Sequence, residues 1–176
     1  TITATGADKA YNGNALATVT LSLASGSGVQ GNDASALSFS YGTATFASSN
    51  VAYNSGNVVT SQTVSVAGIV LAGSAAGNYT FNTTATATAT INPAILTIAA
   101  AASNKAYDRS RTASVTLSNN AIAGDAVEVT YTGATFADAN VGTNKVVTVA
   151  GLSLSGGSAA NYTLNSISSV TANANI

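Results

Sequence analysis

The chain has 176 residues, of which 6% are charged, and its formal net charge is −1. This balance excludes the basic surface that binding to nucleic acid or to an anionic membrane requires. The chain contains no Cys and no His. It therefore lacks thiolate nucleophiles, the commonest general base and the commonest zinc ligands. We expect a protein that is not an enzyme, with no cofactor, no metal and no catalytic residues.

Two further features of the composition bear on context. No apolar run reaches the roughly 18 residues that a spanning helix needs, so we expect no membrane insertion. The chain also starts at Thr1 and contains no Met. We therefore expect it to be an excised or processed piece of a longer protein, with any targeting signal outside it.

The first half of the chain predicts short strands. Apolar and polar residues alternate over 17–23, 37–41 and 84–91, and this period of two is typical of half-buried strands. Asn12-Gly13 precedes the first of these runs and predicts a tight turn with positive φ at both residues. Gly42 interrupts a strand-like run, as Gly133 does later, which predicts a bulge or a bend.

The second half repeats the first. "KAYNGNALATVTLS" (9–22) matches "KAYDRSRTASVTLS" (105–118), and "YGTATFA" (41–47) matches "YTGATFA" (131–137). A third match joins "GIVLAGSAAGNYTFN" (68–82) to "GLSLSGGSAANYTLN" (151–165). The spacing falls from 96 residues at Lys9 and Lys105 to 90 and then 83. The first copy is therefore longer in two connections, which we expect to be surface loops.

These patterns predict an all-β fold of two tandem Ig-like β-sandwich modules joined end to end, 1–94 and 95–176. The only proline, Pro93, lies in "INPAILTI" (91–98), where a short Pro-containing joint is stiffer than a Gly/Ser linker. A β-helix shares the Gly, Asn, Thr and Val content, but it predicts a period of roughly 20–25 residues. The observed spacing excludes it.

Four short motifs follow one another in the same order in each copy: a KAY phrase (KAYD at 105–108), ATF (134–136), a Val/Gly segment and NYT (161–163). The two sets together cover nearly the whole chain. With the "TATATATINPAILTI" joint, it resembles the YDG/MBG-type repeats of large bacterial surface proteins and adhesins. The resemblance implies a secreted, cell-surface array, without a known ligand or catalytic residue. The second copy departs from the family name, because Arg109 follows Asp108 where Gly13 follows Asn12. Asp108-Arg109 is poorly suited to positive φ, so we expect a different turn there.

The acidic residues do not form an evident catalytic pair. Asp125 and Glu128 are three positions apart, so on a strand they point to opposite faces. Calcium usually needs several carboxylates close together, and no D-x-D-x-D run occurs. A weak calcium site built from loop oxygens stays open as an alternative.

Lys9 and Lys105 stand in the same phrase of each copy, and Asp33 in "GNDA" matches Asp125 in "GDA". We therefore predict the ion pairs Lys9–Asp33 and Lys105–Asp125, each tying the opening segment to the next loop. One alternative is that both lysines are solvated charges that prevent edge-to-edge aggregation. A Lys–Asn isopeptide cross-link is a second alternative, which would need a buried lysine and a catalytic acid.

For function, the sequence favours structural stalk or spacer repeats of a bacterial cell-surface or secreted adhesin. The expected partners are neighbouring repeats of the parent chain, together with a host, surface or matrix ligand. The alternative is a carbohydrate- or protein-binding module of such an adhesin. Tyr53 lies in the extra segment of the first copy and has no counterpart in the second. It is the candidate residue for a binding loop.

Overall fold

The computed structural model describes residues 1–164 and 169–176, and it is all-β, with 45% of residues in strands. This confirms the predicted fold class at the level of secondary structure. The chain divides into two compact units, Thr1–Asn92 and Pro93–Ile176. The division falls at the Asn92–Pro93 bond, just before the predicted division between residues 94 and 95.

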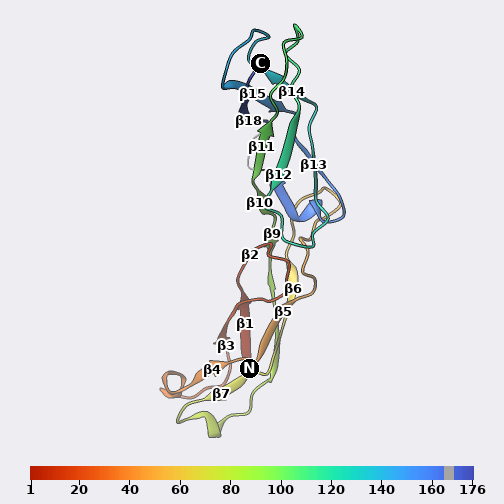
Figure 1. Ribbon diagram of the computed structural model, residues 1–176. Helices are drawn as coiled ribbons and strands as arrows, with labels where there is room; N and C mark the ends of the chain where they lie inside the picture. The colour runs from red at the N-terminus through yellow and green to blue at the C-terminus, as the bar shows by residue number, and fades with distance from the viewer. Residues whose placement is uncertain (165–168) are drawn as a thin grey trace. The chain divides into compact units, whose positions relative to one another are not determined.

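The first unit is built from short strands that pair mainly in antiparallel fashion (Figure 1). Its strands are β1 (Ile2–Gly6), β2 (Lys9–Ala10), β3 (Val19–Leu23), β4 (Ser38–Ser40), β5 (Thr43–Phe46), β6 (Gln62–Ala67), β7 (Val70–Ala72), β8 (Thr84–Ala89) and β9 (Ile91–Asn92). A three-stranded sheet has the order β5-β6-β8, and the pairs are β1-β3, β4-β7 and the parallel pair β2-β9. Two 3₁₀ turns, η1 (Asp33–Ala36) and η2 (Ala76–Asn78), lie in its loops.

The second unit repeats the antiparallel part of this plan, whereas its parallel pair joins segments that are not equivalent to β2 and β9. Its elements are β10 (Ala94–Leu96), β11 (Ile98–Ala102), β12 (Val115–Asn119), β13 (Glu128–Thr130), β14 (Gly133–Phe136), β15 (Lys145–Ala150), β16 (Ser153–Ser155), η3 (Ala159–Asn161), β17 (Tyr162–Leu164) and β18 (Ser169–Ala174). The sheet order is β14-β15-β18, with the pairs β11-β12 and β13-β16 and the parallel pair β10-β17.

The strand registers show which positions of the two units are equivalent. Phe46 lies opposite Val64 in β5-β6, and Phe136 lies opposite Val147 in β14-β15. The extra length of the first unit falls in the loops 24–37 and 47–61, whose counterparts are 120–127 and 137–144. Length differences between strands leave the ladders intact, which is the arrangement that the spacing predicted.

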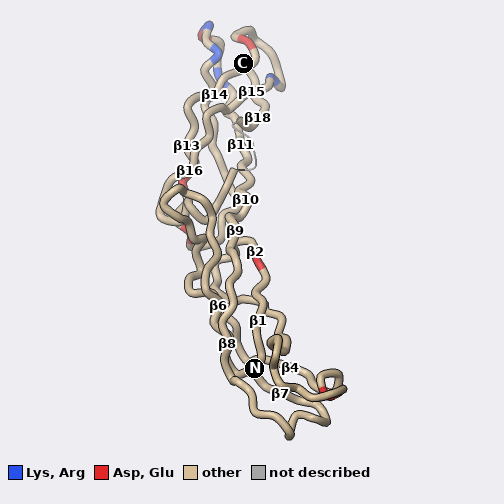
Figure 2. The backbone as a smooth tube through the Cα atoms, turned by 180° about the vertical axis from the view of Figure 1, so that it is seen from behind, with Lys and Arg blue, Asp and Glu red and all other residues tan. Residues whose placement is uncertain are grey.

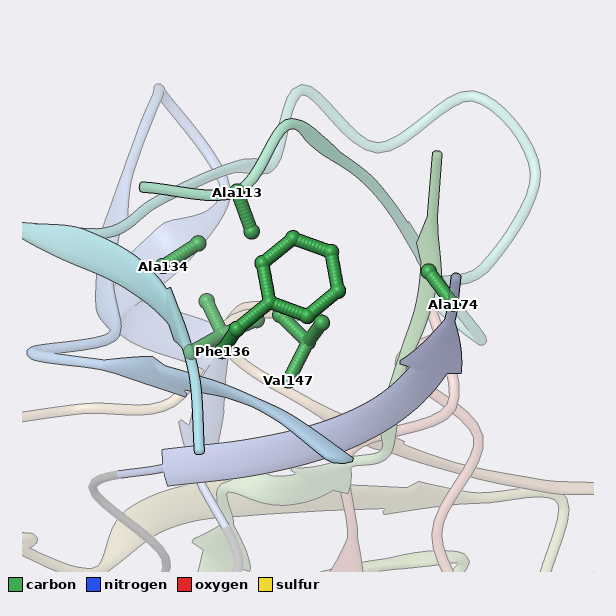
Figure 3. Close-up of a cluster of buried hydrophobic side chains, with 6 residues drawn as sticks. Ala113, Ala134, Phe136, Val147 and Ala174 are labelled. Carbon is green, nitrogen blue, oxygen red and sulfur yellow. The ribbon is translucent and has the colours of Figure 1, made fainter. Parts of the chain in front are cut away.

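The core of each unit comes from the alternate residues of these strands. In the second unit, the Phe136 ring lies among Ala113, Ala134 and Val147, and side chains of β11 and β12 pack against this cluster (Figure 3). Phe136 and Val147 are fully buried. Most of the surrounding residues are Ala and Val, so each contributes little buried area. Removing the Phe136 ring would therefore cost about 3–5 kcal/mol, as for other buried aromatic side chains.

The predicted interruption at Gly42 is a bend between two strands. β4 pairs with β7, whereas β5 pairs with β6, and the chain changes partner at residues 41–42. The Gly42 amide donates to the carbonyls of Ala67 and Gly68. Gly68 has φ +68°, and a Cβ there would lie 3.2 Å from the Gly42 nitrogen. A glycine is required at position 68 for both reasons.

Candidate functional site

The lysine of the first KAY phrase binds the loop that follows it. The Lys9 ammonium donates to the Asn14 carbonyl at 2.7 Å, to Asn14 Oδ1 at 3.0 Å and to the Leu16 carbonyl at 3.0 Å. The Lys9 backbone amide is anchored on the Thr90 carbonyl at 3.0 Å. The side chain thus closes the segment between β2 and β3 into a fixed loop, and burial lowers the pKa of Lys9.

The second KAY phrase makes the same set of contacts. Lys105 donates to the Ser110 carbonyl at 3.1 Å, to Ser110 Oγ at 2.9 Å and to the Thr112 carbonyl at 3.1 Å. Each lysine therefore bonds the residues five and seven positions further on. We call this arrangement the lysine clamp, formed by Lys9 with 14–16 and by Lys105 with 110–112.

Each clamp also lies over the central aromatic residue of its unit. Lys9 Nζ is 5.6 Å from the centre of the Phe46 ring, and Lys105 Nζ is 5.9 Å from the centre of the Phe136 ring. These distances are within the range of cation–π attraction. The repeated lysine therefore joins a loop to the edge of the core, which is a physical reason for the same charge to occur at the same place in both copies.

The predicted pairs Lys9–Asp33 and Lys105–Asp125 are wrong. Lys105 forms its ion pair with Asp108, at 2.7 Å, while Lys9 is held by the oxygens of its own loop. Each lysine side chain reaches oxygen atoms of its own loop, and these atoms satisfy its ammonium group without Asp33 or Asp125. The prediction paired residues because both were repeated, and repetition alone gives no information about contact.

Asp33 and Asp125 are nevertheless equivalent, because each accepts from the tyrosine of an NYT phrase. The Tyr79 hydroxyl donates to Asp33 Oδ2 at 2.8 Å and accepts from the Gln30 amide at 3.1 Å. The Tyr162 hydroxyl likewise donates to Asp125 and accepts from the Ile122 amide. We call this contact the Tyr–Asp lock. It ties the loop after β3 or β12 to the segment that follows η2 or η3.

The turn after each KAY phrase places the same position at positive φ in both units, which corrects the prediction for the second unit and, at Asn12, for the first. Gly13 has φ 79° and Arg109 has φ 63°, while Asn12 is not in the positive region. Asn12 Oδ1 accepts from the Asn14 amide and Asp108 Oδ1 accepts from the Ser110 amide. The short Asn or Asp side chain sets the turn. Arg109 is therefore forced into a conformation that favours glycine.

Asp108 stabilises this turn as an anion. The hydrogen bond from Lys105 and then that from the Ser110 amide lower the pKa of Asp108 from 3.8 to about 2. Asp138 behaves similarly, because the hydrogen bonds from Lys145 and from the Asn140 amide lower its pKa.

The sequence analysis missed a second polar contact at the start of β6 and β15. Gln62, 8% exposed, donates to the Asn50 carbonyl at 2.7 Å and accepts from the Ser48 amide at 3.1 Å. At the equivalent place Lys145 donates to Asp138 and, at 2.6 Å, to the Asn140 carbonyl. A neutral contact in one unit thus replaces an ion pair in the other. One feature of the sequence could have predicted this contact: when the two copies are aligned with a gap, both β6 and β15 begin with a polar residue.

The extra loop of the first unit, 47–61, contains a tight hairpin. Tyr53 is half-buried and forms a bridge with Val59. Asn54 Oδ1 accepts from the amides of Gly56 and Val58, which closes the tip. The loop that carries the candidate residue Tyr53 is therefore fixed by its own hydrogen bonds, and it presents Val58, 59% exposed, at its tip.

Over 1–164 and 169–176, no group of three or more acidic residues lies together as a metal site would require. The charged residues are few, and four of the five basic residues, Lys105, Arg109, Arg111 and Lys145, belong to the second unit, where blue segments lie near the end marked C (Figure 2). Within the described residues, the Lys9 ammonium contacts Asn14 but no carboxylate. An isopeptide reaction would need a carboxylate beside the lysine. No helix in the described residues is long and apolar enough to cross a membrane.

A family model described as the YDG domain matches the chain twice, over residues 1–89 and 92–172. The chain therefore belongs to the YDG domain family, and each unit of the structure holds one match. No curated protein and no solved structure matches the chain.

Proposed function

We propose that the two YDG domains are structural spacer repeats of a bacterial cell-surface or secreted adhesin. The observation that carries this proposal is the use of the repeated polar side chains. The lysine clamp and the Tyr–Asp lock both tie loops to strands within their own unit. Side chains that occur at the same place in both copies thus serve the fold, as expected of modules whose function is to hold a shape.

The same proposal includes the finer architecture. Each unit is an Ig-like β-sandwich, and the two follow one another in tandem, end to end. The packing of the β14-β15-β18 sheet against residues of β11 and β12 supports the sandwich. The direct Asn92–Pro93 connection supports a stiff joint. Small-angle scattering tests the arrangement, because free folding-back of the units would give the radius of a compact 176-residue globule, roughly 16 Å.

The proposed location is extracellular, at the bacterial surface, and the proposed partners are neighbouring repeats of the parent chain. The low charge and the predominance of Ser, Thr, Asn and Gly support a polar, nearly uncharged surface with little electrostatic attraction to other molecules. Neither an enzymatic role nor a cofactor is part of this proposal.

The spacer function can be tested by display on bacteria. The chain is placed between a surface anchor and a nanobody of known antigen, on cells that carry long surface polysaccharide. As a spacer, the chain should increase capture of antigen-coated beads relative to the nanobody anchored directly. Equal capture with and without the chain would contradict the proposal. An unrelated two-domain β protein in the same place is the matched control, and it should act equally well.

A ligand-binding role is the second candidate, and the hairpin of the first unit favours it. A rigid tip with exposed Val58, present in one unit only, is a suitable contact for a protein or carbohydrate ligand. Glycan arrays and immobilised matrix proteins test this role with the chain alone. Saturable binding that Tyr53→Ala or Val58→Ser abolishes would favour the binding module over the spacer.

A further inference from the structure

The two units differ at one strand edge. In the second unit, β17 pairs in parallel with β10, so that Ala94, Ile95 and Leu96 lie opposite Tyr162, Thr163 and Leu164. The equivalent segment of the first unit is 79–81, in which Tyr79 makes the same Tyr–Asp lock as Tyr162. Within the described residues, 79–81 is not part of any strand pair. The first unit thus has the edge without the strand that completes it.

A pocket lies beside this edge. It is lined by residues of the edge, Tyr79 and Phe81, and by the apolar side chains Ile2, Leu37 and Leu71. In the second unit Leu96 lies opposite Leu164, the equivalent of Phe81, and is only 1% exposed. The neighbouring Ile95 is 58% exposed, as alternation along a strand requires.

The exposure of the edge itself agrees with this comparison. Tyr162, covered by β10, is 7% exposed, whereas Tyr79 is half-buried and Phe81 is 38% exposed. Although the Tyr79 amide donates to the Ala76 carbonyl, the segment lies outside any strand ladder, and an apolar edge of this kind is a template for strand addition.

We propose that segment 79–81 is a strand-acceptor site for the joint of a neighbouring YDG repeat. The occupant has the chemistry of Pro93–Leu96: an extended segment with a small residue, an outward-facing aliphatic and a final leucine that enters the pocket. It runs parallel to 79–81. Thr1 is the equivalent of Thr97, so the occupant is the segment that directly precedes Thr1 in a longer chain. The inference rests on the repeat seen in this chain and does not depend on the adhesin role.

The register makes the proposal testable by extension of the full chain. Adding Pro-Ala-Ile-Leu before Thr1 reproduces the sequence that precedes Thr97 in the second unit. The Tyr79 amide already donates to the Ala76 carbonyl, so the test uses residues 80–82. We expect protection within 80–82 to rise at least tenfold in the extended chain, approaching that of 163 and 164. Hydrogen exchange followed by NMR measures both segments in one sample.

Two matched extensions serve as controls. Pro-Ala-Ile-Ser removes the leucine that should fill the pocket and is expected to leave 80–82 unprotected. Pro-Ala-Ser-Leu changes only the residue equivalent to the exposed Ile95 and is expected to protect as well as the parent extension. Equal behaviour of the two variants, or no protection with any extension, would overturn the proposal.

The occupant is distinguished from a second copy by sedimentation. We expect the unextended chain to be monomeric with exchangeable amides at 80–82. A dimer in which these amides are already protected would identify a second copy as the occupant and would overturn the assignment to a joint. Failure of either experiment leaves the display test of the spacer function unaffected, since that test does not depend on the edge.

Discussion

At the scale of single residues, the lysine clamp replaces the ion pairs that the sequence suggested. An ammonium group can donate three hydrogen bonds, and Lys105 directs its donors at two carbonyls and a hydroxyl of one loop as well as at Asp108. Because the Asp108 side chain is 55% exposed, solvent screens its ion pair with Lys105, and we expect the bonds to the loop oxygens to contribute more to stability.

We therefore expect Lys105→Met to lower the free energy of unfolding by about 1–3 kcal/mol. Asp108→Asn should cost clearly less than Lys105→Met, because the carbonyl contacts remain. Urea denaturation of the two variants measures the difference. A cost for Asp108→Asn as large as that for Lys105→Met would show that the ion pair, not the carbonyl set, holds the loop.

Arg109 gives a second prediction at this scale. Its φ of 63° is unfavourable for a residue with a Cβ, while Gly13 occupies the same place without strain. Replacing Arg109 by Gly should raise stability by about 0.5–1 kcal/mol, after allowance for the greater freedom of glycine in the unfolded chain. Arg109→Ala, which removes the charge but keeps the Cβ, is the control and should bring no such gain in thermal melts.

At the scale of elements, the Tyr–Asp lock determines where the long loops lie. We expect Tyr162→Phe to destabilise the second unit by about 1–2 kcal/mol, because it leaves Asp125 and the Ile122 amide without the hydroxyl. Tyr79→Phe should cost less, since Tyr79 is only half-buried.

Tyr131→Phe is the matched control for these variants. Tyr131 is 39% exposed, so loss of its hydroxyl should leave stability unchanged. Differential scanning calorimetry of the three variants checks the order. A cost for Tyr131→Phe equal to that for Tyr162→Phe would argue against a specific lock.

At the scale of the whole molecule, the two units differ in how they should respond to acid. Contacts to Lys105 and Lys145 lower the pKa values of Asp108 and Asp138 in the second unit. A carboxyl group with a lowered pKa in the folded state stabilises that state above its ordinary value, and the contribution is lost as pH falls through the folded value. For Asp108 this window runs from 3.8 down to about 2. In the first unit, Gln62 and Ser48 form the equivalent contact without charge.

We therefore expect β15 to lose hydrogen-exchange protection as the pH falls below 3.8, the ordinary pKa of Asp138, while β6 loses less. Residue-resolved exchange on the full chain measures both strands together. The double variant Asp108→Asn with Asp138→Asn should flatten the response of β15. The same acid sensitivity in β6 and β15 would contradict this assignment.

The strands, the repeat and the places of the length differences could all be predicted from the amino-acid sequence. These features are local, because alternation such as that in 84–91 is visible within a few residues. The turn at Asp108 was mispredicted because propensity favours glycine at positive φ, whereas the Asp108 side chain and the Lys105 contact together overcome that preference in the folded chain.

The partners of the polar residues and the strand pairing of the joint could not be predicted in this way, because they depend on the tertiary structure. Lys9 and Asp33 are both repeated, but their contacts depend on which loops the packed strands bring together. The parallel pairing of Ala94–Leu96 with Tyr162–Leu164 joins segments far apart in the chain. Its register follows from the burial of Leu96 in the completed unit. Such short parallel pairs have no sequence signature of their own, since their stability comes from the core that they cover.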